Sequence, residues 1–187
     1  MSNELLDVVD LGGEPTGQRL EKSFIHENGL WHRDVHVWLS TGTHFLQQQR
    51  AWDKSIMPGA WDISVGGHVA AGESYLEAAQ RETEEELGLA FAAERLKPIG
   101  KLAVAMEIQP GAWTHRVVGE HFLVTEPGLR VEDLHLQRSE VIGARLYPIA
   151  QLAADLASPA TAHRHAPQPP EVWALGIAAL QSKSQGG

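Results

Sequence analysis

Apolar and polar residues alternate along several short segments of the chain, which is the spacing of strands that bury one face. In residues 32–40 (HRDVHVWLS), one face carries Val35, Val37 and Leu39, and the other carries His36 and Trp38. The turn residues that follow predict a hairpin return over 43–49. Further strands are predicted over residues 4–10, 61–65, 101–108, 117–125 and 141–149, with a turn over 11–17 and a loop over 50–61.

Residues 74–89 carry the period of an amphipathic helix instead. Ser74 and Glu77 have the spacing of a capping box, so the helix is predicted to begin near Tyr75, and Gly88 is the natural stop. The expected buried stripe is Leu76, Ala79, Thr83 and Leu87. Helices are also predicted over 150–157 and 171–183, joined by a Pro- and Ala-rich linker over 158–170. This order of strands and helices favours an α/β sandwich with a mixed sheet.

Composition narrows the classes of function. The chain has 187 residues, 43% of them apolar, which suits one domain with a single core. The net charge of −9 argues against a broad nucleic-acid or anionic-membrane footprint. Cysteine is absent, so thiol catalysis and disulfides are excluded. No secretory signal or membrane-length apolar run is evident, and we expect a soluble cytoplasmic protein.

Four glutamates crowd the end of the predicted helix: Glu82, Glu84, Glu85 and Glu86. Like charges three or four residues apart repel, and a helix C-terminus already carries negative partial charge. At about 100° per residue, three of the four fall within one narrow arc, and Glu84 points elsewhere. Gly67 ends a predicted strand just before the helix and has no side chain, so the strand backbone can come close to these three glutamates. Hard cations prefer such oxygen ligands, so a bound Mg²⁺ would convert the repulsion into coordination; the alternative is a solvated acidic face.

Gly67, Glu73 and the run Arg81–Leu89 resemble the Nudix box, G-x5-E-x7-R-E-U-x-E-E-x-G-U, in which U is bulky and apolar. Every fixed position matches. The one departure is Thr83 at a U position, which is mild because its methyl group can still pack. The resemblance implies a Nudix-type α/β/α sandwich with a mixed sheet. It also implies hydrolysis of a diphosphate linked to another group, usually a nucleoside, with Mg²⁺ or Mn²⁺.

The resemblance also implies roles for individual residues. Glu82, Glu85 and Glu86 would hold metal ions or position water, with the Gly67 carbonyl beside them, and Arg81 would orient a carboxylate. Glu82 and Glu85 are both candidates for the base that accepts the proton of the attacking water.

A further acidic ligand often comes from a later strand in this family. Glu120 is our candidate because it shares strand parity with Val118 and Phe122, although an ordinary arginine pairing would explain it equally well.

The likeness covers residues 4–157, so we predict a Nudix hydrolase domain over 1–157. Residues 158–187 would form the linker and a C-terminal helix that packs on or beside the domain.

The flanking segments HRDVHVWL and DKSIMPGAWDISVGGHVAAGE resemble the subgroup related to isopentenyl diphosphate isomerase. That enzyme has a catalytic cysteine where this chain has Gly66, and an arginine where it has Glu82. Of the two acidic ligands expected on the later strand, Glu120 is present and Val118 replaces the other. We therefore expect a hydrolase, with isomerase-like activity as the first alternative. A non-catalytic nucleotide-binding module is the second, disfavoured because no box carboxylate is lost.

Histidines and two cations complete the candidate residues. His26, His32 and His68 resemble the histidine ligands of the isomerase, and His32 and His36 share strand parity, so a second metal site is one interpretation and a structural role the other. Both linker histidines, His163 and His165, are predicted to be solvated.

Arg50 and Lys54 match basic positions that grip the substrate diphosphate in the isomerase-like pattern; the alternative is a pair of solvated loop cations. The expected partner is a small-molecule diphosphate, with no nucleic acid and no membrane, and a homodimer is allowed.

Overall fold

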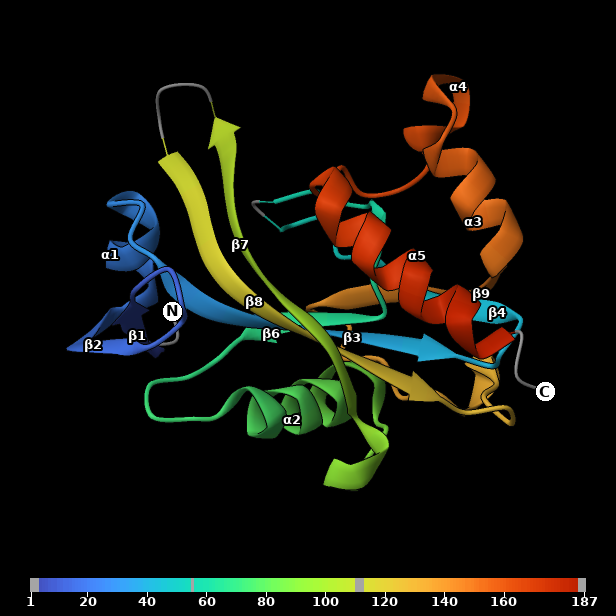
Figure 1. Cartoon of the computed structure of the whole chain (residues 1–187), viewed down its shortest axis with the longest axis horizontal. Helices are drawn as coiled ribbons and strands as arrows, with labels where there is room; N and C mark the ends of the chain where they lie inside the picture. The colour runs from blue at the N-terminus through green and yellow to red at the C-terminus, as the bar shows by residue number, and fades with distance from the viewer. Residues whose placement is uncertain (1–3, 55, 110–112, 185–187) are drawn as a thin grey trace.

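The computed structural model describes residues 4–54, 56–109 and 113–184 (Figure 1). The strands are β1 (Leu5–Val9), β2 (Pro15–Glu21), β3 (His32–Ser40), β4 (His44–Arg50), β5 (Trp61–Asp62), β6 (Val65–His68), β7 (Lys97–Gln109), β8 (Trp113–Thr125) and β9 (Val141–Pro148). The α-helices are α1 (Lys22–Glu27), α2 (Tyr75–Leu87), α3 (Ile149–Leu156), α4 (Pro159–Ala162) and α5 (Pro170–Ser184). None of these described helices is both long enough and apolar enough to cross a bilayer.

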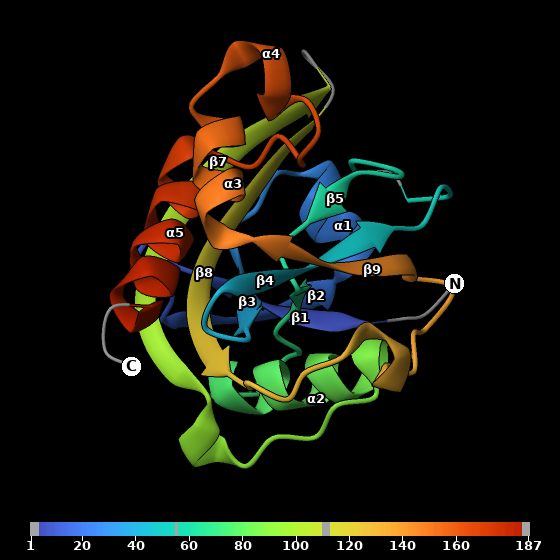
Figure 2. The same cartoon turned by 90° about the vertical axis from the view of Figure 1, so that its right-hand side faces the viewer.

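A mixed sheet runs through the molecule, with α2 on one face and α3 and α5 on the other (Figures 1 and 2). Its strands follow the order β5-β4-β3-β8-β7, and β6 and β9 pair with β3 and β4 respectively. β3 and β8 run parallel, whereas the other pairs in this sheet are antiparallel. The predicted α/β/α sandwich with a mixed sheet is therefore confirmed.

The alternation along β3 divides the core into two layers. Val35, Val37 and Leu39 are fully buried and pack on the side of α2. Trp38 is fully buried on the opposite side, where it packs with Trp173 of α5. Burying a side chain of this size contributes about 1.5–3 kcal/mol, so both faces of β3 help to fix its position in the sheet.

β3 and β4 adjoin near their turn, at Ser40 and Phe45, and then pair with other strands. The Ser64 hydroxyl bridges them, because it donates to the Leu46 carbonyl of β4 and accepts the Leu39 N–H of β3. The prediction of one strand over 61–65 is therefore wrong. The chain forms two strands instead: β5 pairs with β4, and after Ser64 β6 pairs with β3.

The N-terminal segment contains two elements that the sequence pattern did not predict. The turn expected over 11–17 is shorter, because Asp10 accepts hydrogen bonds from the backbone N–H groups of Gly12 (2.8 Å) and Glu14 (3.0 Å). β2 then pairs with β1 as an antiparallel hairpin, and α1 follows it directly. This helix matters for the site because it carries His26.

The segment over 158–170 is more tightly held than predicted. His165 is 3% exposed, so its prediction as solvated is wrong, whereas His163 is exposed. The His165 ring lies 3.0 Å from the Gln47 amide nitrogen and 3.3 Å from an Asp155 carboxylate oxygen, and these partners draw it inward. α5 then packs on β7 and β8. The domain boundary at residue 157 stays a prediction, and residues 1–3 and 185–187 lie outside the described residues.

We expect Gly176→Ala to lower the free energy of unfolding by about 1–3 kcal/mol, as overpacking of a core does. A Cβ atom at this position of α5 would overlap the fully buried Trp38 ring. The clash should outweigh the gain of about 1 kcal/mol in helix propensity. Urea unfolding measures the change. Gly128→Ala is the control, because a Cβ atom there has a single neighbour within 4 Å, 3.7 Å away; equal effects of the two changes would contradict the packing.

Candidate functional site

The helix α2 has the boundaries that its sequence predicts. The Ser74 hydroxyl accepts the Glu77 N–H, and the Glu77 carboxylate accepts the Ser74 N–H, which completes the capping box. Gly88 ends the helix with φ 71°, a left-handed conformation that favours glycine. Thr83 is fully buried, and its hydroxyl donates to the Ala79 carbonyl (2.6 Å). Its polar group is thereby satisfied, so threonine fits at this box position.

Arg81 gathers the acidic groups of the site. Its guanidinium donates two parallel hydrogen bonds to Glu73, both 2.9 Å long. It also donates to Glu82 (2.8 Å) and Glu85 (3.2 Å), and to the backbone carbonyl of His68 (3.0 Å). One side chain therefore fastens the loop before α2 and the end of β6 to the acidic face of the helix.

Gly67 and Glu82 are in direct contact. A Cβ atom on Gly67 would overlap the Glu82 carboxylate, so only glycine lets the backbone of β6 come this close. Burial raises the pKa of Glu82, against the pull of Arg81. The structure thus brings a carboxylate and a strand backbone together, as the sequence predicted.

Glu86 is the most deeply buried of the box glutamates, at 4% exposure. It accepts a hydrogen bond from the Gln48 amide (3.3 Å). Its pKa is raised well above the ordinary value by burial and by the neighbouring charges of Glu82 and Glu140. Such a carboxylate is costly to ionise unless a cation joins it, which is the environment that a metal ligand requires.

The remaining predicted site residues lie in different surroundings. The Glu85 side chain is 51% exposed, and Glu84 is exposed as its helical position predicted. Lys54 forms an ion pair with Glu140. Glu120 pairs across the sheet with Val35 and Lys101, on the face toward α2. It does not line the pocket described below, so its role as a ligand stays a prediction.

A pocket opens on the other face of the sheet. Arg50, Gly66 and Gly67 lie at its wall, and α5 and the segment before it add Gln168, Pro169 and Val172. The polar part of the lining also includes Gln48, two carboxyl groups and four imidazoles: Asp34, Asp62, His36, His68, His115 and His121. Burial raises the pKa of Asp34 to about 7 and lowers that of His36 to about 4. The pocket therefore joins Gly67 of the box, and Gly66 before it, to a row of neutral imidazoles.

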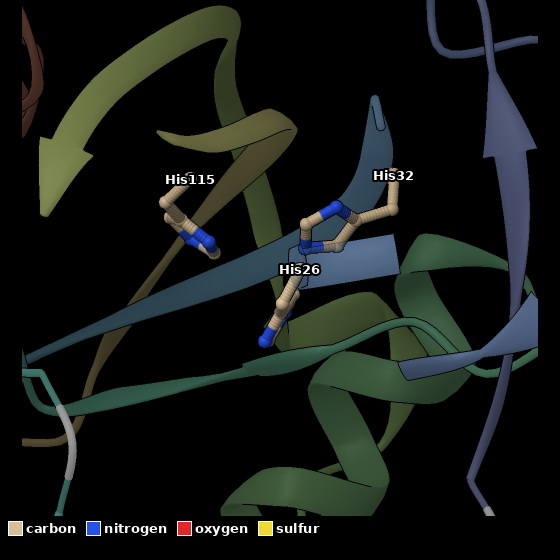
Figure 3. A group of neighbouring side chains, drawn as sticks. All are labelled: His26, His32 and His115. Atoms are coloured by element: carbon tan, nitrogen blue, oxygen red, sulfur yellow. The ribbon is translucent and has the colours of Figure 1, made fainter. Parts of the chain in front are cut away.

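Three histidines from distant parts of the chain converge beside this pocket (Figure 3). His26 of α1, His32 of β3 and His115 of β8 offer ring nitrogens that all lie within 4.8 Å of one another. The His68 ring stacks on His32 at 5.4 Å between centroids. Burial is the main cause that lowers the pKa of each of these four imidazoles, to about 4 for His32 and about 3 for His115.

This histidine cluster, His26, His32, His68 and His115, has the chemistry of a transition-metal site. Neutral imidazoles suit Zn²⁺, Fe²⁺ and Ni²⁺ better than Mg²⁺. His32 Nδ1 lies 3.0 Å from the Leu30 carbonyl, an arrangement that leaves Nε2 bare for a ligand role. Among the described residues, the Nε2 atoms of His32 and His68 have no hydrogen-bond partner.

The cluster corrects one interpretation of the sequence. His36 does not join His32 in it, because its ring stacks on His121 at 4.8 Å. His115 was missed by sequence reasoning altogether. The parallel register of β8 on β3 places it beyond Val117, which pairs with His32, and that pairing is not visible in either strand alone.

The α/β/α fold and the carboxylate-bearing helix α2 are those of the domains that cleave diphosphates. Comparisons with known proteins identify the family. The NUDIX domain family matches residues 30–168. The chain is 32% identical over 157 residues to an uncharacterised Nudix hydrolase of Clostridium acetobutylicum, across 82% of this chain and 74% of that protein. This chain belongs to the Nudix family, whose general activity is hydrolysis of diphosphates with divalent metal ions.

The chain is also similar to other proteins of known sequence or structure. It is 36% identical over 152 residues to Nudix hydrolase 3 of Arabidopsis thaliana, across 79% of this chain but 20% of that much longer protein. An isopentenyl-diphosphate Delta-isomerase of Pectobacterium atrosepticum is 34% identical over 120 residues, 64% of this chain and 65% of that one. In fold, DR0079 from Deinococcus radiodurans superposes with a TM-score of 0.63 at 21% identity, covering 92% of this chain and 97% of that one.

The buried histidines predict a loss of stability in acid. Burial, with the nearby His36, lowers the pKa of His121 to about 2, whereas an unfolded histidine titrates near pH 6.5. Between these values the unfolded chain binds more protons, so stability falls as the pH drops below about 6.5, by about 1.4 kcal/mol per unit for this group. Asn can still accept the Trp38 N–H that His121 Nδ1 accepts.

We therefore expect His121→Asn to make the fall shallower between pH 6.5 and 4.5, measured by urea unfolding of the metal-free protein. His163→Asn, at an exposed position, controls for the loss of an imidazole. A slope for His121→Asn as steep as that of the wild type would show that His121 is protonated in the folded protein.

Proposed function

We propose that this chain hydrolyses a diphosphate linked to a second group, with Mg²⁺ or Mn²⁺ held by the carboxylates of α2. The observation that carries the proposal is the cluster around Arg81, in which Glu82 and Glu85 are bonded to one guanidinium beside the Gly67 backbone. A module that only binds nucleotides would not need all the box carboxylates, whereas this chain keeps every one of them.

The residues present fit a divalent ion. Glu82, Glu85, Glu86 and the Gly67 carbonyl supply the hard oxygen donors that such ions prefer. Burial and the neighbouring Glu82 raise the pKa of Glu86, so a cation beside it would favour its ionised form. When bound, the ion would neutralise phosphate oxygens and lower the pKa of water.

The chain's own groups supply positioning and proton transfer. Arg81 holds Glu82 and Glu85 in fixed directions, so little reorganisation is needed when the substrate arrives. Glu85 is the better placed proton acceptor of the two, because its half-exposed side chain can pass a proton to bulk water.

Arg50 is proposed to contact the substrate diphosphate. It lies in the pocket lining, where its Nε donates to the Ile56 carbonyl (3.1 Å) and its Nη1 lies 3.7 Å from an Asp62 carboxylate oxygen. These contacts fix the side chain and leave Nη2 to donate to phosphate. Lys54 would have to leave its ion pair with Glu140 before it could do the same. We therefore assign Arg50 the larger share of binding.

Isomerase-like activity is the second candidate, favoured by the identity to an isopentenyl-diphosphate Delta-isomerase. The local geometry weighs against it. At Gly66, where the isomerase has its catalytic cysteine, an added Cβ atom would lie 3.2 Å from the His36 ring, so a side chain there is crowded. No cysteine elsewhere in the sequence could replace it.

Purified protein with Mg²⁺ or Mn²⁺ should release phosphate products from at least one member of a panel of nucleoside and prenyl diphosphate compounds, and EDTA should abolish the release. Incubation with isopentenyl diphosphate in deuterated water should give no allylic isomer and no deuterium at carbon, because the cysteine is absent. Isomer formation at an enzymatic rate would overturn the assignment. If the protein binds metal but hydrolyses no compound of the panel, the non-catalytic nucleotide-binding module would be favoured.

Glu86→Gln should lower kcat by at least about a hundredfold, because the loss of a metal ligand weakens charge neutralisation and water activation together. Its fold should persist, since an amide can still meet the Gln48 side chain at this buried position. Glu84→Gln is the matched control: the same chemical change, two residues away, on an exposed side chain. Steady-state kinetics and thermal melting measure both, and similar losses in the two variants would contradict the assignment of the metal-binding face.

A further inference from the structure

Arg50 and Asp62 face each other in the pocket at a distance that calls for an explanation. Arg50 Nη1 lies 3.7 Å from Asp62 Oδ2, which is close enough for an ion pair but too long for a hydrogen bond. Asp62 is 4% exposed, and among the described residues Arg50 is the one lysine or arginine paired with it. A guanidinium and a buried carboxylate this close normally join through charge-assisted hydrogen bonds, so something holds these two apart.

Gln168, from the segment before α5, holds the carboxylate. Its side-chain amide donates to both oxygens of Asp62, at 3.0 Å to Oδ1 and 3.2 Å to Oδ2. The Ile63 N–H also donates to Oδ1 (2.8 Å). These hydrogen bonds satisfy and fix the buried carboxylate, so Asp62 does not have to close on Arg50.

The segment that carries Gln168 is itself fastened. The Gln168 N–H donates to the Ala166 carbonyl (2.8 Å), and the same carbonyl accepts the indole N–H of Trp173 in α5 (3.1 Å). The Ala166 N–H donates to the carbonyl of Trp61 (2.7 Å), the residue before Asp62 in β5. The amide of Gln168 therefore approaches Asp62 from a backbone that is anchored to both β5 and α5.

This arrangement bears on how an anion would enter the site. Arg50, Asp62 and Gln168 all line the pocket, so a phosphate group that reaches Arg50 comes close to the Asp62 carboxylate, which repels it. A carboxylate bonded directly to Arg50 would also compete with phosphate for the same N–H groups. Donors that hold Asp62 at 3.7 Å weaken this competition and keep the guanidinium oriented.

We propose that Gln168 is a positioning residue for diphosphate binding: it holds the Asp62 carboxylate off Arg50, so that the guanidinium stays available for phosphate. The proposal rests on the proposed function, because it takes Arg50 to contact the substrate diphosphate. Gln168 lies beyond residue 157, where the sequence predicts the end of the hydrolase domain, so the segment that leads into α5 belongs to the site.

Calorimetric titration with methylenediphosphonate and Mg²⁺ tests the proposal without turnover. We expect Gln168→Ala to weaken binding about three- to tenfold, the effect of one neutral hydrogen bond, and Arg50→Ala to weaken it about ten- to a hundredfold. Adding Asp62→Asn to Gln168→Ala should restore binding to near the wild-type value, because an amide does not form an ion pair with Arg50. If Gln168 has only a structural role, the double variant will bind no better than Gln168→Ala alone, and the proposal is overturned.

Two further measurements separate the role of Gln168 from the role of Arg50. Gln18→Ala makes the same chemical change as Gln168→Ala at an exposed position and should bind the probe like the wild type. In a crystal structure of ligand-free Gln168→Ala, Arg50 Nη1 and Asp62 Oδ2 should close from 3.7 Å to about 2.7–2.9 Å, and an unchanged distance would overturn the proposal. Wild-type binding by Arg50→Ala would overturn the contact assigned to Arg50 in the proposed function, whereas closure of the gap would still support the spacing role of Gln168.

Discussion

The contacts of Arg81 are the interaction on which the rest of the site depends. Carboxylates one turn apart at the end of a helix repel each other, and the helix dipole adds to that cost. Arg81 joins Glu82 and Glu85 of α2 to Glu73 of the preceding loop and to the His68 carbonyl of β6. Each bond is partly solvated and weak alone, but the paired hydrogen bonds to Glu73 fix the guanidinium plane. Arg81 therefore holds the acidic face of α2 together.

The same contact links two chemically different environments. His68 gives its carbonyl to Arg81 and turns its imidazole toward the histidine cluster, while Gly67, one residue earlier, lies against the Glu82 carboxylate. Since successive residues of a strand point to opposite faces, β6 separates hard oxygen donors on one side from neutral imidazoles on the other. A short strand with two glycines allows this, because it brings its backbone close to α2 without side chains between them.

How much could be foreseen from the sequence depends on how local each feature is. The limits of α2 and the packing of Thr83 follow from spacing within a few residues, and the structure has both. His115 could not be found this way, because its position depends on the parallel pairing of β8 with β3. His165 was misjudged for a related reason: the partners that bury it, Gln47 and Asp155, lie on other elements. The strand break at Ser64 likewise required knowing which strands diverge.

The same division separates the residues proposed to cleave the diphosphate from the residues that shape the pocket. The groups proposed to cleave the diphosphate lie mainly in one contiguous stretch of sequence, so they can be transferred between relatives as a unit. The groups that line the pocket come from β3, β7, β8 and α5 among other segments, and their arrangement depends on the whole sheet and on the C-terminal helix. A change in α5, which packs on β7 and contributes Val172 to the pocket wall, can therefore alter which substrate fits without touching the carboxylates.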